Sequence, residues 1–169
     1  MTTIRQATTQ DRHHLTQMRH ALQHHDQTSN PHIWHITDQG KQKVPDQVDE
    51  MLSNQDGLVL IAEHDNRPIG FAYGSVTSRE DYTPATVGFI NLIYIKEGHR
   101  RKGTGTRMVR RLTEFFKAHG AEEANLNYIK GNTQGENFYR KLGFEVVKVT
   151  ANTPIENLEK HLSVQDHDS

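Results

Sequence analysis

No cysteine occurs in the 169 residues, so disulfides, thiolate zinc sites and a cysteine nucleophile are excluded. Neither sign of charge is in excess, because 20 basic residues face 21 acidic ones, and a net charge of −1 gives no bulk attraction to nucleic acid or anionic membranes. No stretch approaches the roughly 20 apolar residues that cross a bilayer, and residues 1–10 lack a signal-peptide core. We therefore expect a cytoplasmic protein with neither a membrane nor a nucleic acid as partner.

Length and periodicity predict a single domain over residues 1–162, followed by a polar tail over 163–169. Apolar residues that recur every three to four positions predict helices at 9–25, 46–54, 104–119 and 133–142. Apolar runs predict strands at 3–7, 57–63, 69–76, 87–95, 124–129 and 143–150, while 155–162 fits a strand or a helix. The strand–helix order of the second half implies parallel pairing through helical crossovers. Residues 26–45 lack a clear period and are interpreted as an irregular connection of the kind that often acts as a lid.

A basic, glycine-containing loop follows the most hydrophobic run of the chain, residues 87–95. Three consecutive cations precede two glycines that bracket a threonine, and a helix begins at once; these residues are Arg100, Arg101, Lys102, Gly103, Thr104, Gly105 and Thr106. A helix start offers unpaired N–H groups and a partial positive charge, and glycine lets an anion approach them closely. The arrangement predicts a pyrophosphate site, with a basic turn at a glycine helix start as the alternative. Gly120 is predicted to end this helix as its C-cap.

Two common phosphate-binding motifs do not fit this loop. Gly98 and Gly103 have the spacing of a Walker A motif, but Thr104 and Gly105 follow where that motif requires Lys and then Ser or Thr. The dinucleotide fingerprint G-x-G-x-x-G would need a glycine at the position of Met108. The description that does fit the loop is Arg-x-x-Gly-x-Gly.

A second motif lies at residues 132–144, with the sequence NTQGENFYRKLGF. Gly143 is placed to take the left-handed conformation that ends a helix, with Phe144 as the hydrophobic contact after it. This segment resembles motif B of the GNAT superfamily of N-acetyltransferases, and the Arg-x-x-Gly-x-Gly loop resembles motif A of the same superfamily. Gly135 stands where that family usually has alanine.

The resemblance implies a GNAT fold of the α/β (α+β) class, with a mixed, mostly antiparallel central sheet of six to seven strands. Its parallel central strands would splay apart, and about four helices would flank the sheet. The resemblance also favours a last strand at 158–162. It implies transfer of the acetyl group of acetyl-CoA to a primary amine of a small molecule or peptide, by direct attack in a ternary complex. A non-catalytic acetyl-CoA sensor is the alternative.

The resemblance further implies roles for individual residues. Acetyl-CoA is expected between strands that splay near Ile95 and Ile129, and Tyr139 is expected to protonate the leaving thiolate. The expected cofactor contacts are Ile93, Tyr94, Ile95, Arg100, Arg101, Lys102, Gly103, Thr104, Gly105, Thr106, Asn132, Gly135 and Asn137. The expected acceptor contacts are Trp34, Tyr82 and Asn91.

The sequence assigns neither a general base nor a metal. Many family members carry a carboxylate in the middle of the central strand, but this chain has Asn91-Leu92 there, so no general base is assigned. No metal is expected, because no carboxylate or cysteine completes a set with His20 and His24, which we interpret as part of a solvated helix face. The identity of the amine and the oligomeric state are not readable, and since dimers are common in the family a homodimer remains open.

Overall fold

The structure, a computed structural model, describes residues 1–165, with side chains through Val164. The chain divides into two compact units, Met1–Thr133 and Gln134–Ser169. Within the described part of the chain, no helix combines the length and the apolar character needed to cross a membrane.

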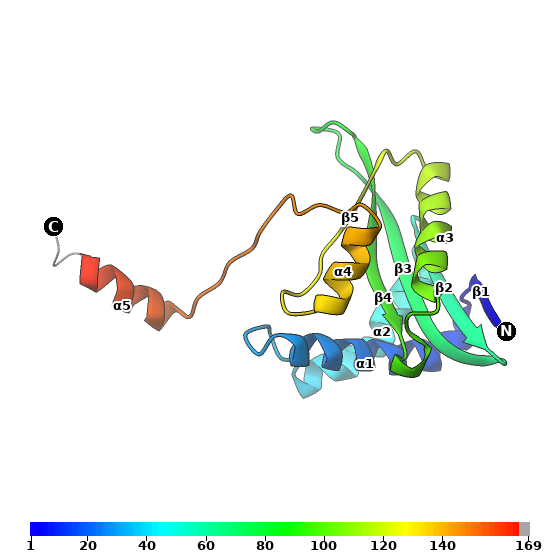
Figure 1. The fold of residues 1–169 in the computed structure, drawn as a ribbon, viewed down its shortest axis with the longest axis horizontal. Helices are drawn as coiled ribbons and strands as arrows, with labels where there is room; N and C mark the ends of the chain where they lie inside the picture. The colour runs from blue at the N-terminus through cyan, green and yellow to red at the C-terminus, as the bar shows by residue number, and fades with distance from the viewer. Residues whose placement is uncertain (166–169) are drawn as a thin grey trace. The chain divides into compact units, whose positions relative to one another are not determined.

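The larger unit is built on one mixed sheet with strands in sequence order (Figure 1). The strands are β1 (Thr2–Gln6), β2 (Gly57–His64), β3 (Arg67–Ser78), β4 (Thr86–Ile95) and β5 (Glu123–Leu126). The first four pair antiparallel, and β5 pairs parallel to β4. Asp65 and Asn66 join β2 to β3 with φ of 50° and 62°, as a tight hairpin turn with the twist of its strands requires.

Three α-helices cover the two faces of this sheet (Figure 1): α1 (Arg12–Ser29) and α2 (Asp38–Ser53) on one face, and α3 (Thr104–Ala118) on the other. Short 3₁₀ turns, η1 (Thr9–Asp11) and η2 (Glu97–His99), precede α1 and α3. Strand β2 is buried on both faces because Val59 and Ile61 join the core under α1 and α2, whereas Leu60 and Ala62 alternate to the other side.

Helix α3 packs closely against two glycines of the sheet, Gly74 and Gly88. A β-carbon at Gly88 or Gly74 would collide with the ring of Phe116, so the absence of side chains there lets the helix approach the sheet closely. The same helix ends as predicted. Gly120 has φ of 78°, its N–H donates to Lys117 O, and the N–H of Ala121 donates to Phe116 O. Together these bonds make a Schellman motif.

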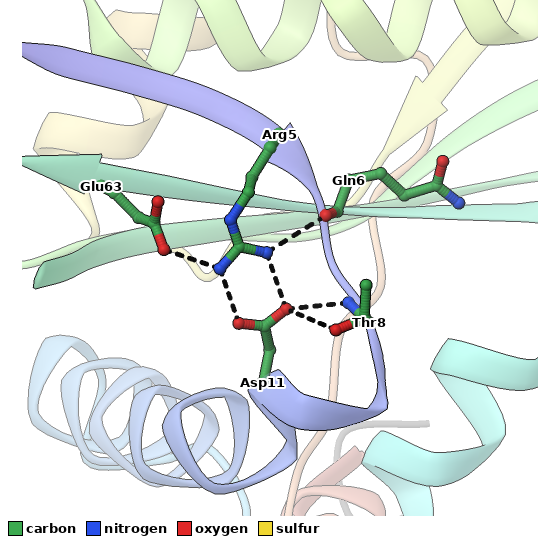
Figure 2. A network of polar contacts seen from close by, with 5 residues as sticks. All are labelled: Arg5, Gln6, Thr8, Asp11 and Glu63. Carbon is green, nitrogen blue, oxygen red and sulfur yellow. Dashed lines mark hydrogen bonds and ion pairs between the residues drawn. The ribbon is translucent and has the colours of Figure 1, made fainter. Parts of the chain in front are cut away.

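A network of charges ties β1 to β2 and to the turn before α1 (Figure 2). The Arg5 guanidinium donates two hydrogen bonds of 2.8 Å to Asp11 and one of 2.6 Å to Glu63. Asp11 is only 5% exposed and also accepts from the Thr8 N–H at 2.8 Å. Hydrogen bonding to Arg5 lowers the pKa of Asp11, against the effect of burial.

The smaller unit contains most of α4 (Thr133–Lys141) and α5 (Ile155–Gln165). The predicted end of the first of these helices is confirmed. Gly143 has φ of 90°, and its N–H donates to Arg140 O while the N–H of Phe144 donates to Tyr139 O. The Phe144 ring lies 6.0 Å from the Tyr139 ring, which is the hydrophobic contact expected after the cap.

The expected α/β class, with a mixed and mostly antiparallel sheet flanked by helices, is confirmed, but several expected elements are wrong. Within residues 1–165 the sheet has five strands rather than six to seven, and there are five α-helices rather than about four. The predicted strand at 143–150 is irregular backbone, because no neighbouring strand pairs with it in that range. Residues 155–162 belong to α5, since Ile155, Leu158 and Leu162 follow a helical period. The predicted tail at 163–169 overlaps this helix up to Gln165, and its remainder lies outside the described residues.

The predicted irregular connection at 26–45 is much shorter than expected. Helix α1 runs on to Ser29, and α2 begins at Asp38 rather than after Pro45. The hydroxyl of Thr37 accepts from the Gly40 N–H at 3.0 Å and caps this earlier start. Pro45 lies inside the helix, where the burial of Val44 and Val48 outweighs its cost.

Candidate functional site

The pairing of the two parallel strands stops halfway along β4. Ladder partners run from Val87 opposite Glu123 to Ile90 opposite Leu126, and no strand lies on that side of residues 91–95 in the described chain. The ladder to β3 shifts at this same point, because Tyr73 pairs with Leu92 and the next residue pairs with Ile90. Asn91 is therefore the extra residue of a β-bulge, a device that bends a strand away from its neighbour.

The second half of β4 has backbone groups with no strand to pair with. The Lys96 N–H donates to Ile69 O at 2.8 Å, so alternation directs the backbone of Tyr94 to β3 and the backbone of Ile93 and Ile95 to the open side. The carbonyl of Ile95 accepts from Arg100 Nε at 2.7 Å. The strand thus offers an open edge to which an extended ligand can add hydrogen bonds.

The loop after β4 is folded around its own charges. Arg100 reaches back to the strand end, with its guanidinium 5.9 Å from the centre of the Tyr94 ring. The Lys102 ammonium donates to Gly98 O at 3.1 Å, and Arg101 is exposed with φ of 59°. Two of the three predicted cations therefore hold the loop in shape, and the third faces solvent.

The start of α3 has the properties of an anion site. Gly103 precedes the helix with φ of 79°, and a β-carbon there would meet nothing within 4 Å. The first helical hydrogen bond runs from the Arg107 N–H to Gly103 O at 3.1 Å. The N–H groups of Thr104, Gly105 and Thr106 come before it and have no intrahelical acceptor. Donors, helix dipole and open space at the glycine together fit a pyrophosphate group.

The residues of the second motif fall on either side of the boundary between the two units. Asn132 is in the larger unit and donates its N–H to Ile129 O at 3.0 Å. Gly135, Asn137 and Tyr139 belong to the smaller unit. Tyr139 is 8% exposed, and its ring centre lies 5.2 Å from that of Phe138.

A surface pocket of about 490 Å³ lies where α1 and α2 meet the bulge of β4. Its lining residues are Arg19, Gln47, Glu50, Met51, Asn54, Tyr73, Asn91 and Leu92. Three lining side chains are held by hydrogen bonds. Asn54 Nδ2 donates to the Tyr73 hydroxyl at 2.7 Å, and Asn91 Oδ1 accepts from the hydroxyl of Ser75, outside the lining, at 2.8 Å.

Of the predicted acceptor contacts, only Asn91 lines this pocket. Trp34 is 78% exposed in the connection between α1 and α2, and Tyr82 is 68% exposed in the loop before β4. Neither is among the lining residues. The sequence reasoning missed the contribution of α2, although Gln47, Glu50, Met51 and Asn54 stand at i, i+3, i+4 and i+7 and therefore share one helix face.

A second, smaller hollow of about 360 Å³ lies at the hairpin between β2 and β3, beside His64, Arg67 and His99. Among residues 1–165, no three or more His, Cys, Asp or Glu side chains gather as a metal would require. The open strand edge, the start of α3 and the larger pocket are therefore the features of the larger unit with the clearest chemistry.

Comparison with known proteins identifies the family. Residues 19–144 match the model of the acetyltransferase (GNAT) family. The chain belongs to this family. The matched range includes the loop before α3, the second motif and the bulge of β4, so the resemblance drawn from the two motifs is confirmed.

Relatives within the GNAT family are distant. Over 76 residues, 45% of this chain, it is 37% identical to the uncharacterized N-acetyltransferase YobR of Bacillus subtilis, but the match spans only 29% of that protein. Over 100 residues, 57% of this chain and 68% of the other, it is 28% identical to an aminoglycoside N(6')-acetyltransferase type 1 of Acinetobacter haemolyticus.

The fold extends to solved GNAT structures. A predicted acetyltransferase from Clostridium acetobutylicum, solved with acetyl-CoA, aligns over 93% of this chain and 98% of its own with a TM-score of 0.74. The sequences are 21% identical, so this likeness concerns the fold.

Proposed function

We propose that this protein is an N-acetyltransferase that transfers the acetyl group of acetyl-CoA to a primary amine of a small molecule or peptide, by direct attack in a ternary complex. The proposal rests on the order of binding groups along one continuous segment, from the end of β4 to the start of α3. The open edge of β4 leads through a basic loop directly into a helix start with free N–H groups and a left-handed glycine. An extended chain that ends in a pyrophosphate matches this order of donors and acceptors.

The residues divide the binding of acetyl-CoA between them. The N–H and carbonyl of Ile93 and the N–H of Ile95 would pair with the amides of the pantetheine arm as a strand does, while the Ile95 carbonyl is bonded to Arg100. The N–H groups at the start of α3 would bind the pyrophosphate, with Arg101 adding charge from the exposed side of the loop. When bound, acetyl-CoA supplies a thioester, in which the CoA thiolate is a good leaving group. A backbone N–H near Ile95 would polarise the carbonyl of this thioester.

The amine is expected to arrive through the pocket beside the bulge. Asn91 bends β4 away from β5 and also lines this pocket, so one residue adjoins both the open strand edge and the space under α1 and α2. Its side-chain oxygen is bonded to Ser75, which fixes the orientation of the amide. An amide cannot accept a proton at neutral pH, and we therefore give Asn91 a positioning role.

Tyr139 is proposed as the acid that protonates the leaving thiolate. Support comes from its place in the second motif and from the helix cap at Gly143, which holds the end of α4 in a defined conformation. The role needs only the hydroxyl, whereas packing against Phe138 and Phe144 needs only the ring.

The Tyr139→Phe variant tests this function. Removal of the hydroxyl should lower kcat by about 10²–10⁴, the usual value of general acid catalysis, with a much smaller change in the KM for acetyl-CoA. Thiol release across a panel of amines measures both constants, and Phe138→Leu serves as the packing control. A kcat within twofold of the parent, where chemistry limits the rate, would remove Tyr139 from the mechanism. Binding of CoA without turnover of any amine would favour a sensor instead.

A further inference from the structure

One side chain of the larger pocket has an unusual electrostatic environment. The Nε of Arg19 is buried and has no hydrogen-bond partner in the described chain. The guanidinium makes one hydrogen bond there, a long one of 3.4 Å from Nη2 to Gln47 Oε1. A guanidinium has five N–H donors, so most of the donors of Arg19 have no partner among the described residues.

Arg19 also has no ion pair within the described part of the chain. Among residues 1–165, no carboxylate lies within 4.0 Å of its nitrogens. Burial lowers the pKa of Arg19, and the charge of Asp26, further along α1, opposes that change only in part. A desolvated cation without a partner is costly to the folded state and gains strongly from an anion.

The pocket also holds one opposite charge. Glu50 of α2 is the carboxylate among its lining residues, and it is exposed rather than paired with Arg19. The lining therefore presents one cation and one anion that do not touch each other. A ligand with one ammonium and one carboxylate is complementary to this arrangement, and a guanidinium binds a carboxylate through two parallel hydrogen bonds. A strongly cationic amine would instead meet the charge of Arg19.

We propose that the acceptor is a zwitterion, an amine that also carries a carboxylate, and that Arg19 binds this carboxylate in the pocket under α1 and α2. This inference rests on the proposed function, because it identifies the pocket as the acceptor site. Arg19 determines specificity: its charge selects among amines, while acetyl transfer depends on other residues.

Paired probes test the inference. Glycine, 4-aminobutanoate and 6-aminohexanoate, each compared with its own primary carboxamide, vary the charge at three chain lengths. The full chain, saturated with CoA so that no reaction occurs, is titrated with each probe by calorimetry. For at least one pair the parent should bind the carboxylate tenfold or more tightly than the amide. Arg19→Gln should reduce that ratio to within twofold without changing CoA affinity.

A matched control lies on the same helix. Arg12 forms a bidentate pair with Asp49, with bonds of 2.7 and 2.9 Å, and is not among the pocket residues, so Arg12→Gln should keep the full preference for the carboxylate. The inference is overturned if the parent binds no carboxylate probe, if the amides bind equally well, or if the preference survives in Arg19→Gln.

Turnover separates this inference from the proposed function. The same probes are offered with acetyl-CoA, and thiol release is measured. Carboxylate binding that depends on Arg19 but is followed by no thiol release would support the carboxylate-binding role of Arg19 and would contradict acetyl transfer. Thiol release that is equal for carboxylates and amides, in the parent and in Arg19→Gln, would support acetyl transfer and overturn the role of Arg19.

Discussion

Two arginines of the larger unit have opposite environments. Arg5 donates to Asp11 and Glu63 with bonds of 2.6–2.8 Å, and each partner comes from a different element. Arg19 has one hydrogen bond of 3.4 Å and a buried Nε with no partner among the described residues. A fully paired cation joins parts of the fold. An under-bonded cation beside a pocket adds little to the fold, and such exceptions concentrate at functional sites.

The backbone of β4 shows the same contrast within a single strand. Up to Ile90 the strand is paired on both sides, and beyond Asn91 it is paired only with β3. Backbone groups left without partners are rare inside folded proteins and indicate where a ligand adds the missing bonds. We therefore expect the paired groups to control stability and the unpaired groups to control binding.

The largest change in stability is expected at the paired site. Asp11→Ala removes a buried carboxylate that accepts from Arg5 and from the Thr8 N–H, and Arg5 keeps only Glu63 as its carboxylate partner; the free energy of unfolding should fall by about 2 kcal/mol. Chemical denaturation measures this loss, and CoA affinity should not change. The control Asp49→Ala removes the exposed partner of Arg12 and should have a much smaller effect. Equal losses in the two variants would contradict the structural role of the Arg5 network.

The next largest effect is expected at the start of α3. Gly103→Val places a branched side chain at φ of 79° in the space assigned to pyrophosphate, so CoA should bind at least tenfold more weakly, about 1.4 kcal/mol. Calorimetry with CoA measures the change. Gly98→Val is the matched control, because Gly98 is in the same loop, has open space around it and lacks a positive φ. Unchanged CoA affinity in a folded Gly103→Val would contradict the anion site.

Acid should remove part of the stability that the Asp11 carboxylate contributes to the folded state. The pKa of Asp11 is lower in the folded chain than in the unfolded chain, where it is about 3.9. The unfolded state therefore binds the proton first, and the stabilisation is complete above about pH 4 and disappears as the pH falls through the folded value. Urea unfolding at a series of pH values should show a constant difference between the parent and Asp11→Ala near neutrality, which shrinks below about pH 4. A difference that grows in acid would contradict this assignment.

The smallest change is expected at Arg19. Arg19→Met replaces an unpaired, partly buried cation with an apolar side chain of similar length, so the free energy of unfolding should change by less than about 1 kcal/mol or rise slightly. Thermal unfolding with and without CoA measures it. A loss as large as that of Asp11→Ala would show that Arg19 is a structural residue and would contradict the difference in role between Arg5 and Arg19.

Sequence reasoning succeeded where the determining interactions are local. The caps at Gly120 and Gly143 depend on residues within a few positions of one another, and both were predicted. The loop before α3 was identified for the same reason, since its cations, glycines and helix start are contiguous.

Interactions between distant segments were not readable. Tyr73, Asn91 and the face of α2 come together only through the bulge and the packing of two helices on the sheet, so the pocket could not be assembled from spacing. The start of α2 was missed because tertiary burial of Val44 and Val48 outweighs the effect of Pro45. The expected strand at 143–150 has suitable side chains but no partner in the described chain, and pairing decides whether a strand forms.

Gly74 and Gly88, which lie under the Phe116 ring, help to set the tilt of α3 on the sheet. Phe116 lies about 12 Å along the helix from the fully buried Met108, and Thr104 lies about 6 Å beyond it on the other side. If Met108 is the pivot, an added methyl group at Gly88 that lifts Phe116 by about 1 Å would tip Thr104 by about 0.5 Å toward the sheet. That displacement equals the positional tolerance of about 0.5 Å that a binding constellation allows. On this geometry, a side chain added at Gly88 would reach the start of α3 through the tilt of the helix.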